Sequence, residues 1–301
     1  MIVIDIAKDC FNCIINFLST DDIYPFMETC KFFNNFIKEY KIQNKCFKLK
    51  QPCAYHITQS IEMIEWAKSH SNFEYSYKIS QCTSRRDNLK LLKYLYKDGC
   101  IFDYNVLVEA INNQNLKIIK WFLKKNIDVD DLCFHKACEK GDFDIIKILK
   151  KNNIHGDYNW ESCYSAVKGG NLELLNYLIN EGYKFYINSY IEAAKNGNIK
   201  ILKYLLNVAL HDLSYPLFDV NVTAEAAKYR NLKTLKWLKK NGCEWDCLTT
   251  YFLFKNNKIK ILKWSLEKGC PIYEPLYENL YKNNIIDIER NKCNIINGMY
   301  I

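Results

Sequence analysis

The side chains that could support catalysis or metal binding are five histidines and fourteen cysteines, scattered over 301 residues. No His-Glu-x-x-His, no glycine-rich phosphate-binding loop and no nucleophile elbow occurs in the sequence. Cys10 and Cys13 form a Cys-x-x-Cys pair, but no second pair at zinc-finger or zinc-ribbon spacing accompanies it. We therefore predict no catalytic site, no metal site and no cofactor, and a protein that is not an enzyme.

The remaining reactive side chains have structural explanations. Paired acids such as Asp21-Asp22 and Asp130-Asp131 precede apolar segments, where carboxylates cap helices. We interpret His135 as a structural turn residue, because no other histidine lies near it in the sequence. The scattered cysteines are expected to be reduced, small, buried hydrophobic residues.

A short helical unit recurs along most of the chain, and any functional side chain must be positioned by it. Its first apolar residue falls at positions 61, 89, 116, 143, 172, 199, 232, 259 and 286. The steps between copies are 28, 27, 27, 29, 27, 33, 27 and 27 residues, which is typical of a repeat array. The apolar residues of a copy fit one helix face, and Gly or Asn ten residues on predicts a left-handed helix stop.

A second short helix is predicted before each of these, as at Ser189–Lys195. Five copies have alanine six residues before the first apolar residue, where a small side chain lets two helices approach closely. These repeat-packing alanines are Ala110, Ala137, Ala166, Ala193 and Ala226. Outer copies have Thr83, Leu253 and Leu280 at this position, and we expect less crowding there.

The paired helices resemble the ankyrin repeat, over roughly residues 60 to 295. Phe134-His135 and Ala137 match the Leu-His-x-Ala part of the family's Thr-Pro-Leu-His-x-Ala signature, whereas the Thr-Pro pair is absent. The resemblance implies an all-α, ankyrin-type helical repeat solenoid of about eight to nine short repeats that binds other proteins. The repeat is shorter than the family's ~33 residues, so we expect stubby hairpin fingers between repeats. Residues 207–221, in the longest step, are expected to build one full-length finger.

Residues 1–45 lack the repeat and resemble an F-box. The blocks that match that family are Ile6-Ala7, Ile14-Ile15-Asn16-Phe17-Leu18, Asp22-Ile23 and Cys30-Lys31-Phe32-Phe33, with Ala7 in place of the usual proline. The resemblance implies that Ile6, Ile14, Ile15, Leu18, Asp22 and Ile23 bind the Skp adaptor. We expect a domain order of F-box-like three-helix segment (1–45), linker (46–59) and ankyrin array (60–301).

An F-box beside a protein-binding array is the layout of a substrate receptor in an SCF-type ubiquitin ligase. The expected partners are then a Skp adaptor, a cullin and an unidentified target protein. An alternative interpretation is a plain ankyrin scaffold, in which residues 1–45 form a helical cap on the first repeat.

Lysines recur one, four and eight residues after the first apolar residue of the second helices, and we call them the lysine stripe. Its members are Lys90, Lys93, Lys97, Lys117, Lys120, Lys124, Lys147, Lys151, Lys200, Lys203, Lys233, Lys236, Lys240, Lys260 and Lys263. Together with the net charge of +8, the stripe allows two interpretations: a solvated face, or a surface for nucleic acid or an acidic partner. Aromatic residues such as Tyr94 and Trp121 lie on the opposite flank, which disfavours base stacking.

Composition limits the remaining possibilities. The sequence is 49% hydrophobic and 25% charged, and it contains neither a secretory signal pattern nor an apolar stretch long enough to cross a membrane. We expect a monomeric intracellular protein that does not insert into a membrane. The richness in Ile, Lys, Asn and Tyr, together with the two resemblances, is similar to proteins of giant viruses of amoebae and of poxviruses. A viral origin would place the protein in the host cytoplasm or nucleus.

Overall fold

The computed structural model describes residues 54–70, 73–156, 160–286 and 295–296. The chain divides into two units, residues 1–133 and residues 134–301. The F-box-like segment and its proposed adaptor-binding residues, Ile6 to Ile23, lie outside the described residues.

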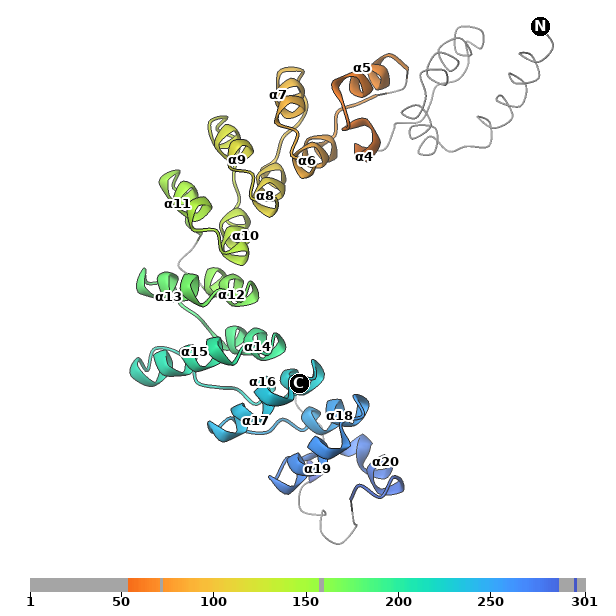
Figure 1. Cartoon of the computed structure of the whole chain (residues 1–301), viewed down its shortest axis with the longest axis vertical. Coiled ribbons are helices and arrows are strands. Elements are labelled where there is room, and N and C mark those ends of the chain that lie inside the picture. The colour runs from red at the N-terminus through yellow and green to blue at the C-terminus, as the bar shows by residue number, and fades with distance from the viewer. Residues whose placement is uncertain (1–53, 71–72, 157–159, 287–294, 297–301) are drawn as a thin grey trace, which may run out of the picture. The chain divides into compact units, whose positions relative to one another are not determined.

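The first unit is a stack of helix pairs (Figure 1). The first helix of each pair packs on the first helix of the next, and the second helix packs against its partner. The first helices are α4 (Ala54–Ile57), α6 (Tyr77–Arg85) and α8 (Tyr104–Asn112), and the second helices are α5 (Ile61–His70), α7 (Leu89–Lys97) and α9 (Leu116–Leu123).

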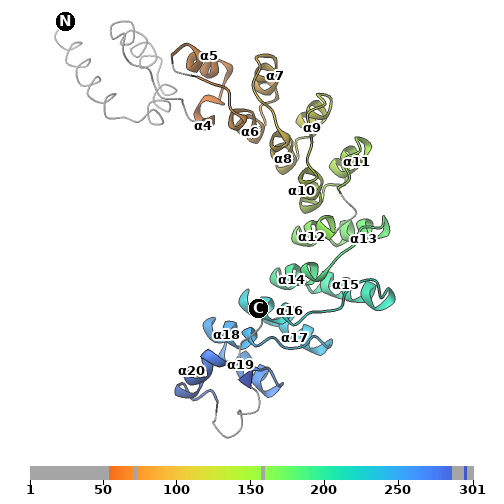
Figure 2. The same cartoon turned by 180° about the vertical axis from the view of Figure 1, so that it is seen from behind.

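The second unit continues the same alternation, and both views show its first helices in one row and its second helices in another (Figures 1 and 2). The first helices are α10 (Leu132–Lys140), α12 (Trp160–Lys168), α14 (Ile187–Lys195), α16 (Asn221–Lys228), α18 (Leu248–Lys255) and α20 (Tyr277–Lys282). The second helices are α11 (Phe143–Lys151), α13 (Leu172–Asn180), α15 (Ile199–His211), α17 (Leu232–Lys240) and α19 (Ile259–Glu267). The described residues thus confirm the predicted all-α helical repeat fold.

A small non-helical feature follows α19. Strand β1 (Ile272–Tyr273) pairs in parallel with β2 (Ile295–Ile296), and the 3-10 helix η1 (Glu274–Leu276) follows β1. The sequence pattern did not predict this two-stranded pairing, because each strand is two residues long.

Side-chain caps fix where the second helices begin. Asn88, Asn171 and Asn198 each accept a hydrogen bond from the backbone N–H three residues later. Asp142 and Asn115 cap α11 and α9 in the same way. Such caps satisfy backbone donors that have no partner inside the helix.

Left-handed residues end the second helices, as predicted. Gly99 and Gly182 have φ values of 83° and 95°, and Asn153 has a φ of 59°. The residue after each stop donates its N–H back to the helix: Cys100 to Leu95 O and Tyr183 to Leu178 O, both at 3.0 Å. This hydrogen bond is the one expected of a Schellman-type helix end.

All five alanines of the repeat-packing position are buried without exposed surface. The expectation of less crowding at Thr83, Leu253 and Leu280 is wrong, because these three side chains are equally buried. Thr83 is compatible with that burial because its hydroxyl donates to Ile79 O at 2.8 Å within the same helix. A threonine whose hydroxyl is hydrogen-bonded within its own helix can therefore be buried at this position as alanine is.

Residues 207–221 do not build a hairpin finger. Instead α15 continues to His211 and is 13 residues long, whereas α13 and α17 have nine. The longest step thus lengthens a helix by about one turn. The predicted linker, residues 46–59, contains a helix of the array. Ala54–Ile57 form α4, and Ile57 is buried in the same core as Ile64.

Gly169 lets two first helices approach closely at their ends. A Cβ built on Gly169 would overlap the backbone oxygen of Glu139, although the glycine itself has no left-handed backbone. We expect Gly169→Ala to lower the free energy of unfolding by about 1–2 kcal/mol, because the end of α12 must move away from α10. Chemical denaturation monitored by circular dichroism measures this loss.

Asn196→Ala is the matched control, since Asn196 occupies the same position in the next repeat. Its side chain contributes two long hydrogen bonds, of 3.4 Å to Lys168 O and 3.5 Å to Glu192 Oε1, so we expect a cost below about 1 kcal/mol. Equal losses in the free energy of unfolding for Gly169→Ala and Asn196→Ala would contradict the explanation that α10 and α12 approach closely at Gly169.

Candidate protein-binding surfaces

Three surfaces of the array are built differently: the face of the first helices, the lysine stripe on the second helices, and the lengthened part of α15.

The first helices of the second unit carry neutralised charge. On α10, Glu139 lies 2.9 Å from Lys136, and Lys168 of the neighbouring α12 reaches the same carboxylate at 3.4 Å. Burial alone would raise the pKa of Glu139, but the hydrogen bond and charge of Lys136 outweigh it and hold that pKa below its ordinary value. This carboxylate therefore links two repeats as an anion.

Similar lysine–glutamate pairs occur on the first helices α14 and α16. Glu192 is only 4% exposed, and it pairs with Lys195 at 3.1 Å and accepts a hydrogen bond from Tyr164 of α12 at 3.1 Å. On α16, Lys228 pairs with Glu225 at 2.8 Å. Such pairs contribute little to stability where they are exposed, but they leave the first-helix face without a large net charge.

Aromatic rings lie among these pairs. Tyr229 is 45% exposed, and the ammonium groups of Lys195 and Lys228 each lie 5.5 Å from its ring centre. Tyr251 and Phe252 on α18 contact each other edge to face, with ring centres 5.2 Å apart. Exposed aromatics within a neutralised polar surface are typical of protein interfaces.

A ladder of asparagine amides connects neighbouring first helices, and the sequence analysis missed it. Asn113 Nδ2 donates to Arg85 O at 2.8 Å, and Asn256 Nδ2 donates to Ala227 O and Lys228 O at 3.0 and 3.1 Å. These carbonyls belong to the last turn of the preceding helix, where no helical donor remains. The recurrence of Asn three residues before the first apolar residue is the signal that could have revealed the ladder.

The lysine stripe is exposed at every predicted position. Within the described ranges, none of its lysines lies within ion-pair distance of a carboxylate, in contrast to the paired lysines of the first helices. Lys236 instead lies 5.6 Å from the ring centre of Trp264 on the next second helix. The rings flanking the stripe are thus half-buried and partly covered, which limits base stacking.

The lengthened end of α15 and the segment after it expose three leucines that the sequence analysis did not single out. Leu210 on α15 is 62% exposed, and Leu213 and Leu217 in the following segment are 94% and 54% exposed. Leu210 also lines a groove of about 280 Å³ between α15 and α17, together with Leu206 and Trp237 and the polar side chains of Lys203, Asn207 and Asn241.

His135 lies inside α10 and not in a turn, which corrects the interpretation from the sequence. Its Nδ1 atom is 3.5 Å from Glu161 Oε2, and its buried Nε2 atom has no hydrogen-bond partner in the described part of the chain. Among the described residues, no group of three His, Cys, Asp or Glu side chains could hold a metal ion, and no helix could cross a membrane.

The buried cysteines are poor nucleophiles. Burial raises the pKa of Cys133, Cys163 and Cys243 to about 12. Because the thiolate is the reactive form, we expect these three thiols to stay unmodified by a maleimide in the native protein and to react once it is unfolded. Mass spectrometry of the labelled peptides tests this, and native labelling as fast as in denaturant would contradict the burial of these thiols.

Comparison with protein families identifies the repeat. Residues 107–189 match the family model for ankyrin repeats (3 copies), and no curated protein matches the chain. The matched range begins within α8 and ends within α14, so it contains the pairs α10/α11 and α12/α13 and most of the pair α8/α9. Ankyrin repeats in general bind protein partners, which indicates a role in protein–protein interaction for the matched repeats.

Proposed function

We propose that the protein is a substrate receptor of an SCF-type ubiquitin ligase. In this proposal, residues 1–45 dock on a Skp adaptor that is bound to a cullin, and the ankyrin array holds the target protein. The observation that carries the proposal is the F-box-like pattern at Ile14–Leu18 and Asp22-Ile23, placed directly before a protein-binding array.

The arrangement of the chain supports separate binding functions for residues 1–45 and for the array. Helix α4 begins at Ala54 and its Ile57 joins the first core of the array, so the array has its own first helix pair without residues 1–45. In this proposal, the apolar side chains of residues 1–45 bind the adaptor and not the first repeat. The alternative role, a helical cap on the first repeat, requires Ile14 and Leu18 to be buried against the array.

The face of the first helices in the second unit is the surface we propose for the target protein. It combines neutralised charges with the exposed ring of Tyr229 and the rings of Tyr251 and Phe252. Aromatic residues contribute much of the binding energy at protein interfaces. The similarity to viral proteins further suggests that adaptor and target are host proteins of the cytoplasm or nucleus.

A pull-down from cell lysate tests the proposal, with the full chain and a chain lacking residues 1–45 as baits. Mass spectrometry should find the Skp adaptor and a cullin with the full chain alone, and the target protein with both baits. Recovery of the target with both baits, but of adaptor and cullin with neither, would instead support the plain scaffold.

A further inference from the structure

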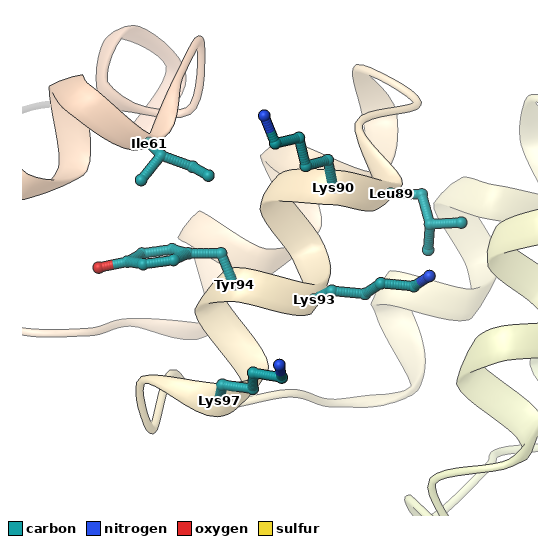
Figure 3. A pocket seen from close by; sticks show the side chains of 6 residues that line it. All are labelled: Ile61, Leu89, Lys90, Lys93, Tyr94 and Lys97. Atoms are coloured by element: carbon teal, nitrogen blue, oxygen red, sulfur yellow. The ribbon is translucent and has the colours of Figure 1, made fainter.

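A surface groove of about 490 Å³ lies between α5 and α7 of the first unit. Its lining combines three half-buried apolar or aromatic side chains, Ile61, Leu89 and Tyr94, with three exposed lysines, Lys90, Lys93 and Lys97. Figure 3 shows the lysines at successive positions along α7, with Tyr94 extending toward the side of Ile61. The volume falls within the range of ordinary ligand pockets, about 300–1,000 Å³.

Buried anchors hold the groove in place. Leu91, Leu92 and Leu95 fix α7 in the core, and Ile64 fixes α5. The Tyr94 hydroxyl donates to a carboxylate oxygen of Glu65, which positions the ring at the floor of the groove. An incoming side chain would therefore meet a preformed apolar surface and would not have to order it.

The lysines of the groove are not neutralised by the protein itself. Two other cations of this unit are paired: Lys68 with Asp98 at 2.6 Å, and Arg85 with Glu109 at 2.5 Å. Of the described acids, none lies within ion-pair distance of Lys90, Lys93 or Lys97, although the charge of Lys90 makes a small contribution to lowering the pKa of Glu62. Three positive charges around an apolar floor complement an anionic partner that also carries an apolar side chain.

We propose that this groove binds an acidic peptide segment of a partner protein, with one apolar side chain seated between Ile61 and Tyr94. The three lysines pair with carboxylates on either side of that anchor. A nucleic-acid backbone would satisfy the lysines but leave the apolar floor unused, and Tyr94 is half-buried with its hydroxyl bound to Glu65. The proposal is independent of adaptor docking, because it uses only residues of α5 and α7.

Fluorescence anisotropy with the full chain tests the groove. The probe is a short fluorescein-labelled peptide of glutamates around one central leucine, and we expect micromolar binding. Combined replacement Lys90→Glu, Lys93→Glu and Lys97→Glu should weaken binding roughly tenfold or more, because three exposed attractions become repulsions. Replacing the peptide leucine with serine should also weaken binding, because the apolar floor then has no partner.

The matched control is Lys117→Glu, Lys120→Glu and Lys124→Glu, which makes the same charge change at the corresponding repeat positions, two on α9 and one at its C-cap. These lysines do not line the groove, so at about 0.15 M salt, where screening acts over about 8 Å, the loss should be much smaller. Lys→Gln at the three groove positions should weaken binding without changing the melting curve, which separates lost attraction from a folding defect.

Three results would overturn the proposal: equal losses in the two Lys→Glu variants, binding that ignores the peptide leucine, or tighter binding of a duplex DNA of equal charge. Absence of binding to the wild-type chain would also overturn it. None of these results tests adaptor docking, which is tested separately by the deletion of residues 1–45.

Discussion

Replacing Ala193 with leucine is expected to lower the free energy of unfolding by about 3 kcal/mol, the upper part of the range for overpacked cores. Ala193 has no exposed surface, and its helix α14 packs against α12, α16 and α15. Three further carbon atoms must therefore push apart elements on several sides, since protein interiors hold few voids. Chemical denaturation with circular dichroism detection measures the loss.

Asn188→Leu is the control for the same helix. Asn188 is exposed near the start of α14, so leucine there should change stability by less than about 0.5 kcal/mol. Thr83→Leu, in the first unit, should cost as much as Ala193→Leu, because Thr83 is fully buried as well. If Ala193→Leu were as mild as Asn188→Leu, the repeat-packing role proposed for the alanines would be wrong.

The second large effect is expected in the N-terminal segment. Leu18→Ala combined with Ile23→Ala should weaken capture of the Skp adaptor at least roughly tenfold, because truncating central apolar anchors commonly costs about 2 kcal/mol or more. In the three-helix segment that the F-box resemblance implies, the helices would be too short to bury all of their large side chains on one another, and Leu18 and Ile23 would have apolar surface left for a partner. Co-precipitation of purified proteins, with wild type and double mutant side by side, measures the change.

The control for this variant is the array itself. Binding of the target protein recovered in the lysate experiment should survive the double mutation, because the array has its own cores from Ile57 onward. Loss of both activities together, with an earlier melting transition, would indicate that Leu18 and Ile23 stabilise the array as a cap.

The regular parts of the fold were predictable because each carries a local physical signal. Asparagine or aspartate caps such as Asn171 and Asp142, and stops such as Gly99, mark helix ends within a few residues of the apolar pattern. The repeat period alone does not show whether the additional residues of the longest step lengthen a helix or a loop. Asn207–His211 contains residues that a helix accepts, and the next residue, Asp212, ends α15 as its C-cap.

The candidate surfaces were less predictable, because they depend on which side chains of neighbouring repeats meet. The lysines of the stripe and Lys195 look alike in the sequence, but the structure pairs Lys195 with Glu192 and leaves the stripe without carboxylate partners in the described ranges. The amide ladder through Asn113 and Asn256 was hidden for the same reason, since its acceptors lie 28 or 29 residues away. The exposure of Leu210 depends on the extension of α15 to His211, which the repeat period does not indicate.

We propose that the chain joins an adaptor-docking segment to an ankyrin array that binds a target protein. Calorimetric titration of the purified wild-type chain with a purified Skp adaptor tests this proposal most directly. We expect one-to-one binding at micromolar concentration or below, and loss of the binding heat when residues 1–45 are removed. No heat of binding with the folded wild-type chain, or unchanged binding after that removal, would contradict it.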